Sequence, residues 1–375
     1  MYFHTLSKDS PTSFVKTQSI PASGSLFFDV LRKRVDKHFV DGHINTHGNG
    51  KLYTKAAIQI LSSIILYVTL VFFTPPVWIA LVLCALLGVN LAVLGFNVMH
   101  EGGHQSFSKH QWINNVSAHF LNVLGGNAYF WKIKHNINHH THTNVEGMDS
   151  DIDVKPFMRL HEGQPRHAYH RYQHLYFVLL YGISYLAWVF YEDFLKYFRG
   201  SVSLINGPMK FTAWRHTTFW VTKVLFVAVY MAIPIVMVGW LPWLIGFLII
   251  TVICGIVISI VFQLAHVVEG TVFFESKDEK QKHDWAIDQL RSTSNFGTKS
   301  GFLHWMLGGL NFQIEHHLFP RISHIHYPAL GVLVKETCVE FDIRYNESRT
   351  LFSAMVSHIA HLRRLGRRVE TAHKS

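Results

Sequence analysis

Four long apolar segments dominate the pattern of hydrophobic and polar positions along the chain. Each is close to the roughly 20 residues that an α-helix needs to cross the hydrocarbon core of a bilayer. The segments come in two pairs, and the short turns within the pairs, 74–76 and 239–243, contain no charged residue. The pattern therefore predicts four transmembrane helices in two hairpins, 56–73 with 77–99 and 214–238 with 244–268.

The distribution of Lys and Arg predicts the orientation of these hairpins. Both residue types are concentrated at the amino end, in the middle and at the carboxyl end of the chain. Because positive residues mark cytoplasmic loops, both turns should face away from the cytoplasm. We expect an all-α integral membrane protein with a cytosolic helical cap, divided into an amino-terminal segment (1–55), a first hairpin (56–99), a cytosolic region (100–213), a second hairpin (214–268) and a carboxyl-terminal cytosolic region (269–375).

Two further segments affect this topology. Segment 175–191 is also apolar and uncharged, and as a fifth span it would separate the first and last histidine clusters. Its Tyr and Trp content favours an interfacial or bundle-packed helix. Segment 26–39 is basic and amphipathic, and we expect it at the membrane face. Residues 1–25 are polar, without the apolar region of a secretory signal, which predicts a disordered start.

Composition agrees with a membrane environment. Hydrophobic residues make up 49% of the chain and charged residues only 15%, against about 25% charged in soluble domains. The net charge of +10 suits anionic lipid, and no nucleic-acid-reading motif accompanies it. The three cysteines form no CxxC pair, which excludes a disulfide framework.

Histidines at regular spacings are the candidate chemistry. The chain has 27 histidines, and three clusters stand out: HEGGH at 100–104, HNINHH at 135–140 and QIEHH at 313–317. Positions four apart share a helix face, so their imidazoles can converge on one ion. A further histidine ends the last apolar segment. The predicted metal ligands are His100, His104, His135, His139, His140, His266, His316 and His317.

Eight imidazoles exceed the needs of one tetrahedral zinc and suit two metals. Imidazole binds Zn, Cu, Fe and Ni alike, so the ligands alone do not identify the metal. Gln313 could ligate through its carbonyl oxygen, hold a water or only form a hydrogen bond. Glu101 and Glu315 are expected to orient histidines. Asp149, Asp151 and Asp153 are candidates for the same role or for capping a turn. Ten other histidines are expected at the surface or the membrane interface: His110, His119, His142, His161, His167, His170, His174, His304, His324 and His326.

The three clusters and their flanks resemble the histidine boxes of membrane fatty acid desaturases. The similar flanks are WKIK before the second box, TN and GMDSDI after it, and GGLNF and LFP around the third. They are typical of the bacterial acyl-CoA, linoleoyl-CoA desaturase-like branch, and the resemblance covers roughly 27–368. It implies two iron ions, with zinc as a substitute in recombinant protein. It also implies that the seven box histidines, which exclude His266, are catalytic.

The resemblance further implies O2-dependent introduction of a cis double bond into a long-chain acyl group, either acyl-CoA or acyl-lipid. Gln in the third box resembles front-end desaturases, which act between an existing double bond and the carboxyl end. A histidine-box hydroxylase or monooxygenase is the alternative enzyme, and a membrane metal transporter or sensor is the non-enzymatic one. Transport would need polar residues along mid-span positions, whereas these histidines gather at helix ends.

Electrons must be supplied from outside if this hypothesis holds. The sequence contains no GxGxxG fingerprint, no His-Pro-Gly-Gly motif of cytochrome b5, and too few cysteines for a four-thiolate iron–sulfur cluster. We therefore expect a separate carrier, a ferredoxin or cytochrome b5, with its reductase. The expected location is a bacterial inner membrane, with the active site on the cytosolic face.

Overall fold

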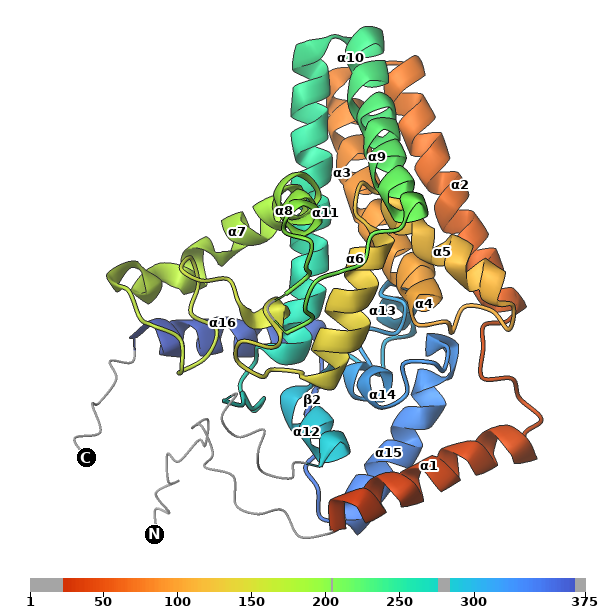
Figure 1. Ribbon diagram of the computed structural model, residues 1–375, viewed down its shortest axis with the longest axis vertical. Helices are drawn as coiled ribbons and strands as arrows, with labels where there is room; N and C mark the ends of the chain where they lie inside the picture. The colour runs from red at the N-terminus through yellow and green to blue at the C-terminus, as the bar shows by residue number, and fades with distance from the viewer. Residues whose placement is uncertain (1–22, 204, 276–283, 368–375) are drawn as a thin grey trace, which may run out of the picture.

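The structure is a computed structural model that describes residues 23–203, 205–275 and 284–367. The predicted disordered start therefore lies almost entirely outside the described residues. Within them the chain is mostly helical, and the single sheet is two short parallel strands, β1 (Asn295–Phe296) and β2 (Glu347–Ser348). Figure 1 shows long helices extending from a cap of shorter ones.

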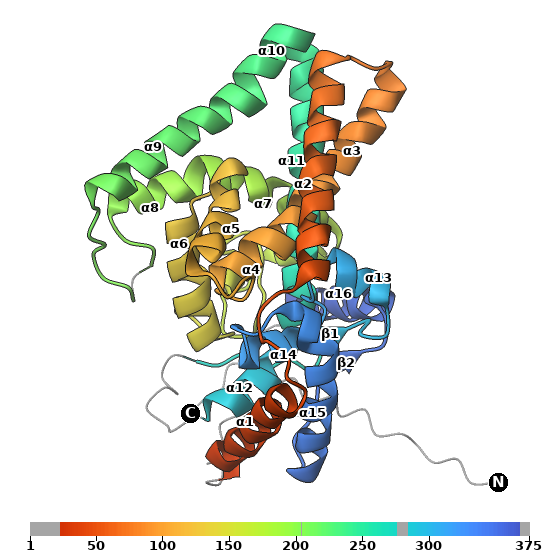
Figure 2. The same ribbon diagram turned by 90° about the vertical axis from the view of Figure 1, so that its right-hand side faces the viewer.

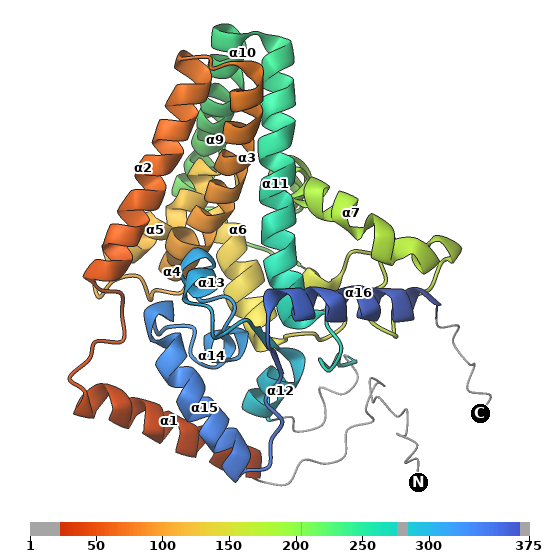
Figure 3. The same ribbon diagram turned by 180° about the vertical axis from the view of Figure 1, so that it is seen from behind.

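The two predicted hairpins form the long part of the molecule. Figures 1 and 3 show both connecting turns at the same end, away from the cap. The first turn contains the Pro75–Pro76 pair, and the second is Gly239, whose φ of 88° favours glycine. The last helix begins at Trp240, four residues earlier than predicted, because Pro242 is tolerated in a first helical turn. The helices are α2 (Gly50–Phe72), α3 (Val77–Leu94), α9 (Ala213–Val227), α10 (Ile233–Val238) and α11 (Trp240–His266).

The described residues contain five helices long and apolar enough to cross a membrane, one more than the sequence pattern predicted. The additional one, Ala168–Arg199, has the lowest hydropathy of the five. Figures 1 and 2 show α7 lying across the hairpins rather than along them. Its parts are η4 (Ala168–Tyr172), α7 (Gln173–Ala187), the π-helical η5 (Trp188–Glu192) and α8 (Asp193–Arg199).

The cap has its own core, and α1 (Ser23–Asp41) belongs to it. The apolar side chains of Phe27, Leu31 and Val35 are buried against α12 and α15. Figure 3 shows α1 beside α15 at the end farthest from the hairpin turns. The expectation that this amphipathic stretch lies on the membrane is therefore wrong, because protein covers its apolar face. The other cap helices are α12 (Trp285–Ser292), α13 (Gly301–Met306), α14 (Gln313–Leu318), η8 (His324–His326), α15 (Tyr327–Glu340) and α16 (Leu351–Arg367).

Short helices connect the first hairpin to the helix that contains α7, and two of them are π-helical. A π-turn contains one extra residue per hydrogen-bonded ring and occurs frequently at functional sites. One π-turn directly precedes His100, and the other contains His135 and His139. The elements are η1 (Gly95–Met99), α4 (His100–Gly103), α5 (Gln111–Val123), α6 (Ala128–Lys132), η2 (Ile133–His139) and η3 (Ser150–Ile152), the first and fifth of them π-helical.

Candidate metal centre

All eight predicted histidines converge where the hairpins meet the cap. Helix α4 and the residue after it carry the two histidines of the first box, and η2 and the residue after it carry the three of the second. His266 is the last residue of α11, and α14 carries the two histidines of the third box. Each is at most 6% exposed. Because two of the long helices end here, the site lies at the end of the bundle opposite both hairpin turns (Figures 1 and 3).

The histidine nitrogens form two sets that share no residue, and a third set, His140, His316 and His317, overlaps both. In the first, one nitrogen from each of four residues lies within 4.8 Å of all the others: His100, His104, His135 and His316. The same criterion joins a second set: His139, His266 and His317. His140 lies between the sets. Its Nε2 is 3.3 Å from Nε2 of His135, and its ring stacks on that of His317, with centroids 4.4 Å apart.

Neighbouring groups fix the orientation of four rings through their Nδ1 atoms. A ligand imidazole usually donates its second N–H to a carboxylate, a carbonyl or another oxygen, which holds the ring in place. The four Nδ1 contacts are His139 to Asp149 Oδ2 (3.0 Å), His317 to Gln289 Oε1 (2.7 Å), His316 to the Tyr327 hydroxyl (3.1 Å) and His266 to the Ser292 carbonyl (3.3 Å). Each contact leaves the opposite nitrogen, Nε2, directed into the site.

Those Nε2 atoms provide the test of whether the site fits metal ions. Among the eight predicted ligands, buried Nε2 atoms of five histidines have no hydrogen-bond partner in the described part of the chain: His104, His139, His266, His316 and His317. Leaving one buried polar atom unsatisfied costs about 1–3 kcal/mol. Five such atoms facing one another are therefore costly in the protein alone. Metal ions would satisfy all of them, so the donor set fits a metal centre.

Burial also sets the protonation state that metal binding needs. It lowers the pKa far below the usual range for five site histidines: His104, His135, His140, His316 and His317. At neutral pH these imidazoles are neutral and can act as ligands. His139 differs. Burial acts to lower its pKa, but the charge of Asp149 and the hydrogen bond to it outweigh burial and raise the pKa.

The acidic residues in and near the boxes differ in what they contact. Asp149 and Asp151 do approach a site histidine, since both carboxylates lie within 3.5 Å of His139 Nδ1. Asp153 pairs with Lys155 instead. Glu315 accepts hydrogen bonds from Asn295 (2.7 Å) and the Tyr345 hydroxyl (2.8 Å), so it contacts no site histidine through these bonds.

Glu101 belongs to a buried polar chain that sequence reasoning missed. Its Oε1 accepts hydrogen bonds from Nδ1 (2.7 Å) and the backbone N–H (3.0 Å) of His324. The other ring nitrogen of His324 lies 2.8 Å from Nζ of Lys55 on α2. Lys55 and Glu101 both belong to apolar hairpin helices, where an ionisable side chain is a signal worth following. These contacts connect both helices of the first hairpin to His324 in the cap.

His324 also corrects the expectation for the remaining histidines. It is fully buried, and so are His161 and His170, although all three were expected at the surface or the interface. His170 donates through Nε2 to the Pro156 carbonyl, 2.8 Å away, and His161 stacks on Phe273. The other seven are at least partly exposed, as expected. None of the ten belongs to the two ligand sets.

Two glycines explain why the first box can pack so tightly. A Cβ added at Gly102 would lie 2.5–2.6 Å from atoms of α5, and one at Gly103 would lie 2.2 Å from the Trp131 ring. Trp131 in turn stacks on His135, with centroids 4.5 Å apart. The glycines therefore let the helix that carries His100 and His104 approach the second box.

Gln313, the ninth candidate ligand, begins α14 one turn before His316. It is 1% exposed, and its Oε1 has no hydrogen-bond partner among the described residues. A side-chain oxygen in this state is available to a metal, a water or a substrate.

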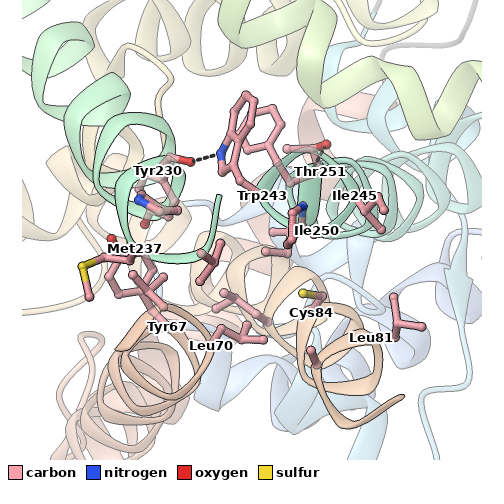
Figure 4. A pocket seen from close by; sticks show the side chains of 18 of the residues that line it. Tyr67, Leu70, Leu81, Cys84, Tyr230, Met237, Trp243, Ile245, Ile250 and Thr251 are labelled. Atoms are coloured by element: carbon pink, nitrogen blue, oxygen red, sulfur yellow. Dashed lines mark hydrogen bonds between the residues drawn. The ribbon is translucent and has the colours of Figure 1, made fainter. Parts of the chain in front are cut away.

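An apolar cavity of about 510 Å³ lies between the two hairpins. Figure 4 shows side chains from both hairpins around it, including Tyr67, Cys84 and Trp243, whose indole donates to the Tyr230 carbonyl. Leu91 lines the cavity and lies nine residues before His100, roughly 13 Å along a helix at 1.5 Å per residue. The cavity therefore extends from Leu91, between the first box and the far end of α3, to the hairpin turns.

Comparison with known proteins gives consistent matches. The fatty acid desaturase family model matches residues 76–349. The sn-1 linoleoyl-lipid 6-desaturase of Arthrospira platensis is 34% identical over 345 residues, covering 91% of this chain and 93% of the relative. The enzyme of the same name from Synechocystis sp. is 32% identical, with 91% and 96% covered. An acyl-lipid (8-3)-desaturase of Physcomitrium patens is 33% identical, with 91% and 72% covered.

Proposed function

This chain belongs to the fatty acid desaturase family and is a membrane oxidoreductase that desaturates fatty acyl chains, and from that premise we propose that it is a front-end desaturase of lipid-linked acyl chains with two iron ions. One observation carries the metal part of the proposal: the buried, unpartnered Nε2 atoms of five histidines from all parts of the site. Neutral nitrogen ligands in two sets suit two ions with open positions.

The two sets of histidines would hold one ion each, and His140 lies where it could serve either. Bound iron would supply the O2 chemistry that breaks unactivated C–H bonds, which acid–base groups cannot break. In the balanced reaction, two adjacent methylenes each lose one hydrogen. O2 accepts these hydrogens, with two electrons and two protons from outside, to form two waters.

The protein orients the histidine rings, excludes water from the site and provides a cavity for the acyl chain. Asp149, Gln289 and Tyr327 fix the ring orientation of three histidines. The site residues are buried, which excludes water that could otherwise compete for the reactive site. We infer that the apolar cavity between the hairpins receives the methyl-terminal part of the acyl chain, because its lining is apolar and Leu91 brings it toward the first box.

The position of the double bond is inferred from the third box and the relatives. Gln313 occupies the position at which the family's front-end members carry glutamine. The names of the relatives, linoleoyl-lipid 6-desaturase and acyl-lipid (8-3)-desaturase, agree with action near the carboxyl end of a lipid-bound chain. We therefore propose a polyunsaturated acyl-lipid as the substrate.

We further propose that the metal centre faces the cytosol and that electrons arrive from a separate ferredoxin or cytochrome b5. Both hairpin turns lack charge, and the site lies at the opposite end. In this topology α7 lies in the membrane interface. Its orientation across the hairpins (Figure 2) supports this placement.

Expression in a host without endogenous desaturase tests the proposal. Fed linoleate, cells with the wild-type chain should gain a fatty acid with one additional double bond on the carboxyl side, identified by mass spectrometry. His266→Ala should abolish the product, since it removes one of three nitrogens from the second set. Equal product from this variant would remove His266 from the site, and a methyl-side double bond would contradict front-end action.

A further inference from the structure

A second pocket lies between α5, α6 and α9 and has a different chemistry from the cavity between the hairpins. Its volume is about 170 Å³. Three basic side chains line it, His119, Lys132 and Arg215, together with the polar Asn127 and Thr218. No acidic residue is present in the lining. α5 packs against both of the other helices, so the pocket walls are held by the fold.

Among the described residues, Lys132 and Arg215 have no counter-charge in this pocket. Across the described ranges, no carboxylate lies within ion-pair distance of Lys132 or Arg215. Lys132 is half-buried, and burial lowers the pKa of its ammonium group. Thr218 Oγ1 is buried without a partner. A partly desolvated cation without a partner is unfavourable, so the pocket is suited to an anion that accepts hydrogen bonds.

Arg215 is held in place for such a contact. Its guanidinium carbon lies 3.9 Å from the centroid of the Tyr129 ring, in a cation–π contact. One terminal nitrogen, Nη1, donates to the Lys210 carbonyl at 2.6 Å. The guanidinium group has five N–H donors in a planar fork that matches phosphate oxygens. The remaining donors are therefore available to a ligand with limited loss of side-chain entropy.

The pocket lies at the level expected for lipid head groups. It borders the first turn of α9, the helix that begins a membrane span at Ala213. Trp214, which lines the pocket, is 73% exposed, as in the aromatic belts that mark a membrane interface. Lys and Arg that serve only to set topology would extend into water. Lys132 and Arg215 instead line a hollow.

The pocket is also close to the metal centre along the chain. Lys132 ends α6 only three residues before His135, about one helical turn away. The residue before Lys132, Trp131, stacks directly on His135. A polar group held by Lys132 would therefore lie near the reacting carbons, as action close to the carboxyl end requires.

We propose that His119, Lys132 and Arg215 bind a phosphate group in the polar head of the acyl substrate. This inference rests on the proposed function and specifies the substrate class: a phosphate-bearing acyl carrier rather than an uncharged lipid. The same chemistry is offered by a phospholipid and by an acyl-CoA. Holding the head at a fixed distance from the ligand histidines would then set the position of the new double bond.

Binding to the purified, iron-loaded protein in detergent tests the proposal without requiring turnover. The probes are dilinoleoyl phosphatidylglycerol, linoleoyl-CoA and dilinoleoyl glycerol, and the variants are Lys132→Met, Arg215→Gln and their combination. Losing a charge-assisted hydrogen bond of about 1.5–3 kcal/mol weakens binding roughly tenfold or more. We expect that loss for a phosphate-bearing probe and none for dilinoleoyl glycerol. Lys109→Met, an exposed lysine outside the pocket, is the matched control.

The binding results distinguish a phospholipid head group from the phosphates of CoA. Weaker binding of phosphatidylglycerol alone would identify a lipid head group, and weaker binding of linoleoyl-CoA alone would identify the CoA phosphates. If the double variant binds both probes as tightly as the wild type, the proposal is overturned. Iron content and thermal stability equal to wild type exclude misfolding as the cause of a loss. A protein that binds these probes but forms no desaturated product would contradict the proposed function and leave the pocket assignment intact.

Discussion

His139 has the most strongly supported ring in the metal centre. Its Nδ1 donates to Asp149, both side chains are 1% exposed, and the same carboxylate also accepts the backbone N–H of Asn144. Substituting Asp149→Asn removes the charge but keeps the shape. Changes to such outer partners typically reduce metal affinity or activity by about tenfold to a hundredfold. We expect a loss of that size in iron content or in desaturation rate.

Asp153→Asn is the matched control for this prediction. Asp153 is four residues away, is 41% exposed, and its carboxylate pairs with Lys155. Metal analysis and product formation for both variants provide the comparison. Equal effects of the two substitutions would mean that Asp149 does not support His139 in the way that the distance suggests.

At this scale the sequence could predict which histidines come together but not all of the residues that support them. Spacing within a helix brings together residues four apart, which identified pairs in the first two boxes, and His266 was identified because it ends the last apolar segment. Glu101 bonds to His324, which is 223 residues away, and His324 in turn contacts Lys55. Such pairs depend on how the cap packs on the first hairpin. Lys55, directly before the predicted apolar segment 56–73, was the one available signal.

At the scale of elements, α3 connects the apolar cavity to the first histidine box. Leu91 lines the cavity and is 5% exposed, whereas Leu86 on the same helix is 51% exposed and faces outward. Leu91→Trp should fill the inner end of the cavity and shift the preference toward shorter acyl chains. Overpacking costs about 1–3 kcal/mol, so thermal stability should fall modestly.

Leu86→Trp is the control, because it adds the same volume on the outer face of α3. Competition between acyl substrates of different chain length, followed by mass spectrometry, measures the preference. An unchanged chain-length profile in Leu91→Trp, with activity retained, would show that the acyl chain does not enter this cavity.

Hydropathy predicted where these helices begin and end better than it predicted whether lipid or protein surrounds them. The four long helices were found with their ends within a few residues, except where α2 begins at Gly50 rather than at 56. α1 shows the limit. Phe27, Leu31 and Val35 recur at helical spacing, which predicts an apolar stripe but not whether lipid or protein covers it. The same limit applies to α7, which is apolar enough to span but lies across the hairpins.

At the scale of the whole molecule, the positive charge predicts how electrons are delivered. The net charge of +10 favours encounter with a small acidic carrier. Salt shortens the screening length from about 10 Å at 0.1 M to about 3 Å at 1 M. Turnover supported by ferredoxin or cytochrome b5 should therefore slow as ionic strength rises. NADPH and O2 without a carrier should give no turnover.

Turnover driven by dithionite is the control, because a small reductant needs no protein docking site. Its rate should depend much less on salt than the carrier-supported rate. A carrier-supported rate that is indifferent to salt would contradict the role assigned to surface charge, and robust turnover with NADPH alone would contradict the need for a carrier.

The mass of the product formed by purified, iron-loaded protein tests the central claim most directly. The assay contains a dilinoleoyl lipid, O2, NADPH, a carrier and its reductase, and iron is measured in the same sample. The account predicts close to two irons per chain and a product acyl group that has lost two hydrogen atoms. A product that has gained an oxygen atom would instead identify a hydroxylase, and full activity with iron absent from the site would contradict the metal centre.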